Sequence, residues 1–109
     1  MFEQLSRADR MLLLEFVCAF AWTDLEIKPG ERKFVERLMD RLKLDPDERK
    51  EVEGHLHVAP APGATNPDRV PREHRRVFIE SVRALIYADG DVDDEERERF
   101  EKLRAALSA

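Results

Sequence analysis

The sequence has few of the residues that mark disulfide-rich, strand-rich or membrane-spanning proteins. Its single cysteine, Cys18, excludes an internal disulfide and is typical of a reducing compartment. Four glycines and one tyrosine are few for a fold rich in strands and tight turns. The longest apolar run, residues 11–22, is interrupted by Glu15 and is shorter than the ~20 residues that cross a bilayer. We therefore expect a cytoplasmic protein that has no transmembrane helix.

Excess positive charge and catalytic motifs are missing as well. The formal net charge is −5 at pH 7, whereas proteins that bind nucleic acid need a basic surface that neutralises phosphates. The sequence holds no glycine-rich phosphate-binding motif, and no nucleophile stands with a histidine and an acid in a hydrolase pattern. These absences predict that the protein has no nucleic-acid partner and is not an enzyme.

What the sequence does contain is typical of one globular helical domain spanning residues 1–109. Its residues are 42% apolar and 39% charged, which is enough of each for a domain that buries its own core. A proline-rich loop is expected at residues 58–70. Helices with apolar residues three or four apart are expected to begin at Ser6, Pro29, Asp45, Pro71 and Asp93. We predict an all-α fold, a compact bundle of about five helices.

An internal repeat with an offset of 65 residues organises these helices. Without a gap, the offset aligns identical residues: Val17 with Val82, Ala19 with Ala84, Asp24 with Asp89, Glu31 with Glu96, Arg32 with Arg97, Glu36 with Glu101, Leu38 with Leu103 and Leu42 with Leu107. Helix periodicity explains the matched leucines, but it does not explain the matched acids of the turns. Trp22 and Tyr87 end equivalent helices and are expected to anchor the core. We predict two related helix–loop–helix units at about residues 6–44 and 71–109.

The turn of the second unit resembles the signature of a known family. Residues 87–96 combine a helix ending in alanine, aspartate and glycine with a β-branched residue, a capping residue and a glutamate that opens the next helix. This pattern resembles the TerB-like (tellurite-resistance-associated) family, and residues 23–31 resemble a degenerate first copy. The resemblance implies a compact, non-enzymatic, all-helical domain that serves inside bacteria in tellurite or other stress responses. It also implies a protein partner, peripheral association with membrane-surface complexes, and divalent-cation binding by the acidic turn.

The acidic turn of the second unit is the candidate metal site. Asp89, Asp91 and Asp93 alternate around Gly90, and Glu96 follows; all four acids offer the hard oxygen ligands that Ca²⁺ or Mg²⁺ prefers. A carboxylate at the C-terminal end of a helix is disfavoured by about 0.3–1 kcal/mol, so Asp89 needs compensation. Either the aspartate folds back onto backbone N–H groups as an Asx-type turn, or a bound cation supplies the charge. The spacing departs from that of an EF-hand loop, which favours the structural turn over the ion site.

The first unit holds a weaker version of this turn. Asp24 and Glu31 align with two acids of the second unit and are its candidate ligands. However, Leu25 replaces the glycine and Lys28 replaces an acid, so a cation site is less expected here than in the second unit.

A basic cluster lies at the start of the predicted fourth helix. It consists of Arg69, Arg72, Arg75 and Arg76. Cations near a helix N-terminus oppose the helix dipole, so these side chains are expected to be solvated or to face an acidic neighbour within the fold. The alternative is a docking site for an acidic partner or a lipid surface. Glu15, inside the apolar run, is expected to reach the surface or to pair with an arginine.

Overall fold

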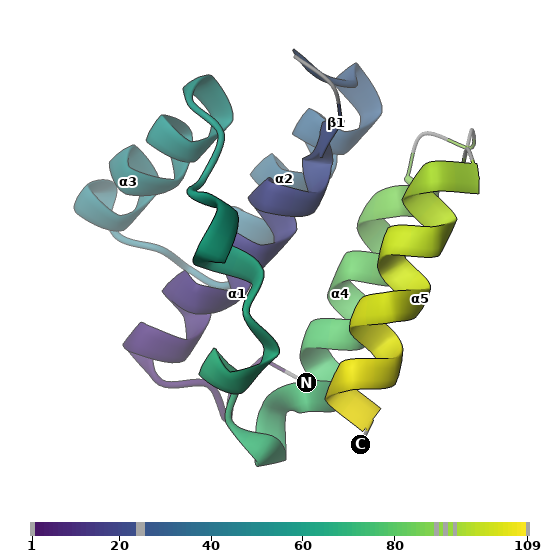
Figure 1. Ribbon diagram of the computed structural model, residues 1–109. Helices are drawn as coiled ribbons and strands as arrows, with labels where there is room; N and C mark the ends of the chain where they lie inside the picture. Colours follow the sequence, from purple (N-terminus) through teal and green to yellow (C-terminus); the bar gives the residue numbers. More distant parts are fainter. Residues whose placement is uncertain (1, 24–25, 89, 91, 93, 109) are drawn as a thin grey trace.

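The computed structural model describes residues 2–23, 26–88, 90, 92 and 94–108 (Figure 1). Within these residues the chain forms five α-helices, three short 3₁₀ helices and one pair of two-residue strands. The α-helices are α1 (Arg7–Ala21), α2 (Pro29–Arg41), α3 (Pro46–His57), α4 (Arg75–Tyr87) and α5 (Asp94–Ser108). The 3₁₀ helices are η1 (Pro62–Thr65), η2 (Pro67–Arg69) and η3 (Arg72–His74). The prediction of a compact all-α bundle is confirmed, with a radius of gyration of 12.8 Å.

Local sequence explains where α1 and α3 begin. The side chain of Ser6 accepts a hydrogen bond from the backbone N–H of Asp9 at 3.1 Å and caps α1. Asp45 and Glu48 form a reciprocal capping box at the start of α3. The fourth helix differs from the prediction, because η3 precedes it and α4 begins at Arg75. Short 3₁₀ segments are common at the N-termini of α-helices.

The corner between α1 and α2 contains a small β-ladder that the sequence did not predict. Strands β1 (Trp22–Thr23) and β2 (Glu26–Ile27) are antiparallel, and Trp22 pairs with Ile27. Helix α1 therefore ends at Ala21, one residue before the predicted end. The ladder pairs backbone groups that the end of the helix leaves unsatisfied.

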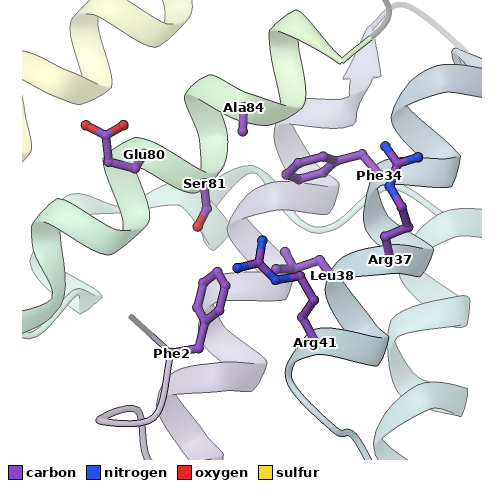
Figure 2. A pocket seen from close by; sticks show the side chains of 8 residues that line it. All are labelled: Phe2, Phe34, Arg37, Leu38, Arg41, Glu80, Ser81 and Ala84. Carbon is purple, nitrogen blue, oxygen red and sulfur yellow. The ribbon is translucent and has the colours of Figure 1, made fainter.

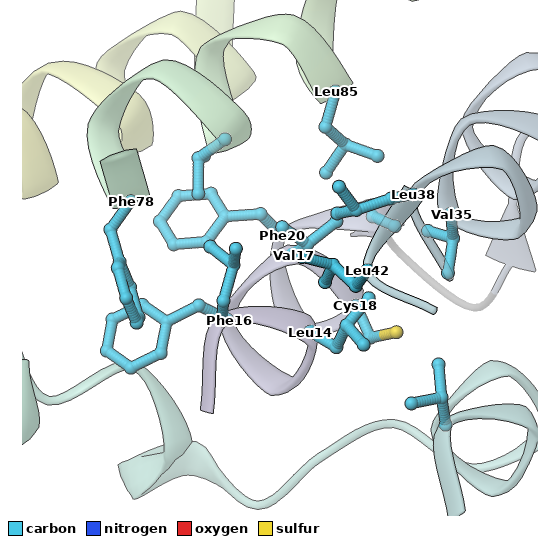
Figure 3. Packing of buried hydrophobic residues seen from close by; sticks show 14 of the residues in the cluster. Leu14, Phe16, Val17, Cys18, Phe20, Val35, Leu38, Leu42, Phe78 and Leu85 are labelled. Atoms are coloured by element: carbon cyan, nitrogen blue, oxygen red, sulfur yellow. The ribbon is translucent and has the colours of Figure 1, made fainter. Parts of the chain in front are cut away.

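Helix α1 lies at the centre of the bundle and packs against α2, α3 and α4, whereas α5 covers α4 (Figure 1). Its buried side chains point in nearly all directions (Figure 3). Phe16 of α1 meets Phe78 of α4 edge to face, with ring centroids 5.4 Å apart and an interplanar angle of 82°. No helix in the described part of the chain is both long and apolar enough to cross a membrane.

The two helix pairs correspond closely at the offset of 65 residues. Helices α2 and α5 begin at equivalent residues, Pro29 and Asp94, and α1 and α4 end within one residue of equivalence. Burial follows the same offset, because both members are buried in each of these pairs: Leu13 and Phe78, Val17 and Val82, Phe20 and Leu85, Val35 and Phe100, Leu38 and Leu103, Leu42 and Leu107. The core is thus assembled from matched positions of both pairs.

Candidate functional site

Two buried glutamates occupy equivalent positions at the start of α2 and α5. Glu31 is the third residue of α2 and Glu96 is the third residue of α5, and their exposed fractions are only 1% and 3%. The first turn of a helix favours negative charge, because its free N–H groups point towards the N-terminus. A carboxylate this deeply buried also needs hydrogen-bonding or charged partners to offset its lost hydration.

Lys28 joins the two helix pairs through one of these glutamates. Its ammonium lies 3.0 Å from Oε1 of Glu96, and the side chains are 26% and 3% exposed. Lys28 stands immediately before α2, at the position equivalent to Asp93 of the second unit. Where the second unit has an acid, the first unit therefore supplies a cation that neutralises the glutamate of the other pair.

The predicted metal ligands fall mostly outside the residues that the structure describes. This applies to Asp24, Asp89, Asp91 and Asp93, whereas Glu31 and Glu96 are described. Within residues 2–23, 26–88, 90, 92 and 94–108, no three His, Cys, Asp or Glu side chains lie together in a way that could hold a metal ion. The cation site therefore stays a prediction that depends on the aspartates.

Arg69 of the predicted basic cluster is bound within the fold. Its guanidinium donates hydrogen bonds to both carboxylate oxygens of Glu15, each at 3.2 Å, and to the carbonyl of Ala64 at 2.9 Å. This fork-shaped contact ties η2 to the middle of α1. It matches the expected pairing of Glu15 with an arginine, and Arg69 has an acidic neighbour of its own.

The other three arginines of the cluster differ in their exposure. Arg72 and Arg76 are exposed, whereas Arg75 is half-buried and its Nε has no hydrogen-bond partner. Beside them His74 is buried, with its Nε2 3.4 Å from an oxygen of Asp9. Two guanidinium groups of the cluster, those of Arg72 and Arg76, thus face solvent at the start of α4.

Cys18 is a buried core residue in the structure. Its side chain is fully buried in α1, and burial together with the nearby charge of Glu15 raises the pKa of the thiol to about 12. A thiol with this pKa is protonated at physiological pH and is a poor nucleophile or metal ligand.

A cavity of about 330 Å³ between α2 and α4 is the main feature that sequence reasoning missed (Figure 2). Its apolar walls come from Phe2, Phe34, Leu38 and Ala84. Arg37, Arg41, Glu80 and Ser81 supply its polar groups. On α2 the lining residues recur at helical spacing, which is the signal in the sequence that could have indicated one shared face.

The guanidinium groups at this cavity carry positive charge, and Arg41 interacts through space with the exposed carboxylate of Glu3. In the part of the chain that the structure describes, neither Arg37 nor Arg41 forms an ion pair. Arg41 lies over the ring of Phe2, 5.0 Å from its centroid, in a cation–π contact. The cavity therefore combines apolar walls with a basic rim.

A second cleft, between α2 and α3, has the opposite character. It is lined by both acids and bases, among them Glu36, Asp40 and Arg49. Arg49 donates a hydrogen bond of 2.6 Å to Asp40. In this cleft an arginine is already paired with an aspartate and the lining is mostly polar, so the α2–α4 cavity, with its apolar walls, is the better candidate for binding.

Comparisons of the chain with protein-family models, curated proteins and solved structures found no match. The resemblance of residues 87–96 to the TerB-like signature therefore stays a prediction from the sequence.

Proposed function

We propose that this chain is a non-enzymatic, TerB-like interaction module whose surface docks a partner protein. The observation that carries this proposal is the α2–α4 cavity, where Arg37 and Arg41 border apolar walls. Apolar surface beside arginines that are not held in ion pairs is typical of surfaces that become covered by a partner. The resemblance of the corner adds the biological setting: a bacterial cytoplasmic complex of a stress response related to tellurite resistance, peripheral to a membrane.

The positions of the hydroxyl and imidazole groups support a binding role. Ser81 provides the hydroxyl of the cavity, whereas His55 and His57 lie on α3 and His74 is buried beside Asp9. A serine nucleophile needs an adjacent base, and these histidines lie away from Ser81, on α3 and beside Asp9. The chemistry that the cavity offers is apolar contact and charge recognition, which are the properties of a docking surface.

Site-specific photo-crosslinking in the producing cell tests this function. A photoreactive residue replaces one exposed residue at a time, at Lys50 on α3, Arg76 and Ala84 on α4, and Glu98 on α5. We expect a discrete covalent adduct with one other protein from at least one of these positions. The proposal would be contradicted if none of these positions gave an adduct and the purified chain turned over a substrate.

A domain that responds to divalent cations is the second candidate. The observation that favours it is the pair of buried glutamates, Glu31 and Glu96, at equivalent positions beside the acidic turns. In this proposal Ca²⁺ or Mg²⁺ binds Asp89, Asp91, Asp93 and Glu96, and Asp24 and Glu31 form a weaker site. The ammonium of Lys28 at Glu96 then competes with the metal for the same carboxylate.

A metal titration separates this candidate from a purely structural turn. Ca²⁺ and Mg²⁺ are added to about millimolar concentration, the weak range for such sites, while the amide shift of Gly90 is followed by NMR. We expect a saturable shift of the Gly90 amide. It should saturate at a lower metal concentration in Lys28→Gln, because the ammonium that competes for the carboxylate is gone. An unchanged Gly90 amide in both proteins would reject the cation site.

A further inference from the structure

We infer that the groove between α2 and α4 receives an acidic amphipathic helix of the partner protein. This inference rests on the proposed interaction function and names the chemistry of the partner. We define the α2–α4 groove as the 330 Å³ cavity together with a neighbouring cleft of about 360 Å³ at Glu80, Arg83, Ala84 and Tyr87. Glu80 and Ala84 line both, so the two hollows adjoin at these residues, although the lining of the second comes from α4 alone.

The floor of the groove is apolar and open to solvent. Phe34 is half-buried, Ala84 is exposed and Tyr87 is 49% exposed. Figure 2 shows the ring of Phe2 at one end of the cavity and the ring of Phe34 at the other, with Leu38 between them. A bulky apolar side chain that entered this space would remove these surfaces from water at about 25 cal/mol per Å² of apolar area.

The charge around the groove selects an acidic occupant. Arg37, Arg41 and Arg83 border it, together with the carboxylate of Glu80 and, near Arg41, that of Glu3, in a chain whose net charge is −5. None of the three arginines forms an ion pair among the residues that the structure describes. Carboxylates pair with guanidinium groups in a bidentate geometry. Acidic side chains beside an apolar anchor would therefore satisfy the rim and the floor together.

A protein segment fits these features better than a nucleic acid. Phosphate backbones bind through extended basic surfaces, and the overall negative charge of this chain opposes them. The aromatic and aliphatic floor would remain exposed under a phosphate backbone. A partner protein offers carboxylates and apolar side chains on one surface.

The shape of the groove favours a helix as the docking element. Its walls are two helices, and on α2 the lining residues Phe34, Arg37, Leu38 and Arg41 extend over seven residue steps. At a rise of 1.5 Å per residue this is about 10 Å, or two turns. An amphipathic helix presents anchors with the same spacing, which is the usual pattern of helix-in-groove recognition.

Selection from a displayed peptide library tests this inference with the full chain as bait. The library contains random peptides of about 18 residues, long enough to form a helix on binding. We expect the enriched peptides to share bulky apolar residues three or four positions apart, flanked by aspartate or glutamate. A synthetic peptide of this consensus is then titrated against wild type and three variants.

The first two variants alter the groove in different ways, and the third is a control. Arg37→Glu/Arg41→Glu reverses the charge of the rim, and both residues are exposed. Ala84→Trp fills the floor without a change of charge. Each should weaken peptide binding at least about tenfold, because charge pairs and apolar anchors both contribute to such interfaces. Lys50→Glu/Lys102→Glu reverses two exposed charges elsewhere and should bind like wild type. Circular dichroism verifies that each variant is folded.

Several outcomes would overturn the inference. They are enrichment of basic or uncharged peptides, no enriched peptide family, and binding that is lost in the Lys50→Glu/Lys102→Glu control but kept in the groove variants. Dodecanoate, a small apolar carboxylate, is titrated separately while the amide shifts of Phe34 and Ala84 are followed by NMR. If these amides shift saturably and no peptide family is enriched, the groove is a small-molecule site instead. If photo-crosslinking yields a partner from Lys50 or Glu98 but not from Ala84, the interaction function stands and the groove assignment fails.

Discussion

The two helix pairs share a pattern of buried positions, yet they differ in what covers their outer faces. Cys18 of α1 is fully buried, whereas Arg83, its equivalent on α4, is exposed. Leu14 and Ile79 show the same contrast, since Leu14 is fully buried and Ile79 only partly so. Helix α3 packs against α1 and has no counterpart in the second unit, where the equivalent face of α4 stays open. One repeated framework thus gives a closed core on one side and an accessible face of α4 on the other.

The largest expected effect separates the two faces of α4. Phe78→Ala removes a fully buried ring and its edge-to-face contact with Phe16. We expect the free energy of unfolding to fall by about 3–5 kcal/mol, the usual cost of such a cavity. Tyr87→Ala, at an exposed ring on the same helix, should cost less than about 1 kcal/mol. Urea denaturation followed by circular dichroism measures both, and equal losses would contradict the assignment of the faces.

The contact between the two pairs is the next test. Lys28→Met leaves the buried carboxylate of Glu96 without its ammonium partner. We expect a loss of about 2–3 kcal/mol, below the ~3–5 of a fully buried pair because Lys28 is 26% exposed. Lys102→Met removes an exposed pair with Glu98 and should change little. The idea fails if both lysine variants unfold at the same urea concentration, or if the double variant with Glu96→Gln recovers none of the loss.

The buried thiol gives a pH-dependent difference between the pairs. In the folded chain the pKa of Cys18 is raised from 9.0 to about 12, so the unfolded chain releases this proton first. The contribution to stability is complete below pH 9 and is lost as pH rises towards 12. Between pH 8 and 10 the loss should be about 1.4 kcal/mol, and Cys18→Ala should abolish this component.

An equivalent thiol on the open face provides the control. Arg83→Cys in the Cys18→Ala background places a cysteine at the matching, exposed position. Its pKa should be close to the unfolded value, so stability should show no added dependence between pH 8 and 10. A dependence as large as that of Cys18 would mean that the two faces are equally covered.

The smallest expected effect compares the two aromatic helix ends. The indole N–H of Trp22 donates a hydrogen bond of 2.7 Å to the carbonyl of His55 on α3. Trp22→Phe removes this bond and should cost about 1 kcal/mol. Tyr87→Phe removes only an exposed hydroxyl at the equivalent position and should leave the midpoint of urea denaturation unchanged. A larger loss for Tyr87→Phe would reverse the comparison.

Some predicted features were correct because they depend on neighbouring residues. The caps at Ser6 and Asp45 follow from side chains that bond to backbone groups three residues away. The prediction that Trp22 and Tyr87 both anchor the core was wrong for Tyr87, which is 49% exposed. Helical spacing places an aromatic residue on a face, but it does not say whether another helix covers that face.

The contacts that define the candidate sites join residues far apart in the chain. Lys28 and Glu96 are 68 positions apart, and Arg69 and Glu15 are 54 positions apart. The sequence shows that Lys28 stands where the second unit has an acid, but it does not show that Lys28 pairs with Glu96. The rim of the groove could not be predicted for the same reason, because it brings arginines of α2 beside α4.

The sequence by itself determined the all-α class, the starts of α1, α2 and α3, and the matched pattern of buried residues. These features depend on capping, proline geometry and helical periodicity, which act over a few residues. Only the tertiary structure decided which helix covers which face, which lysine neutralises Glu96, and where arginines border apolar surface. The reason is physical: a repeated pattern fixes the faces that must be buried, whereas the α3 helix between the two units is present once and leaves one of those faces open.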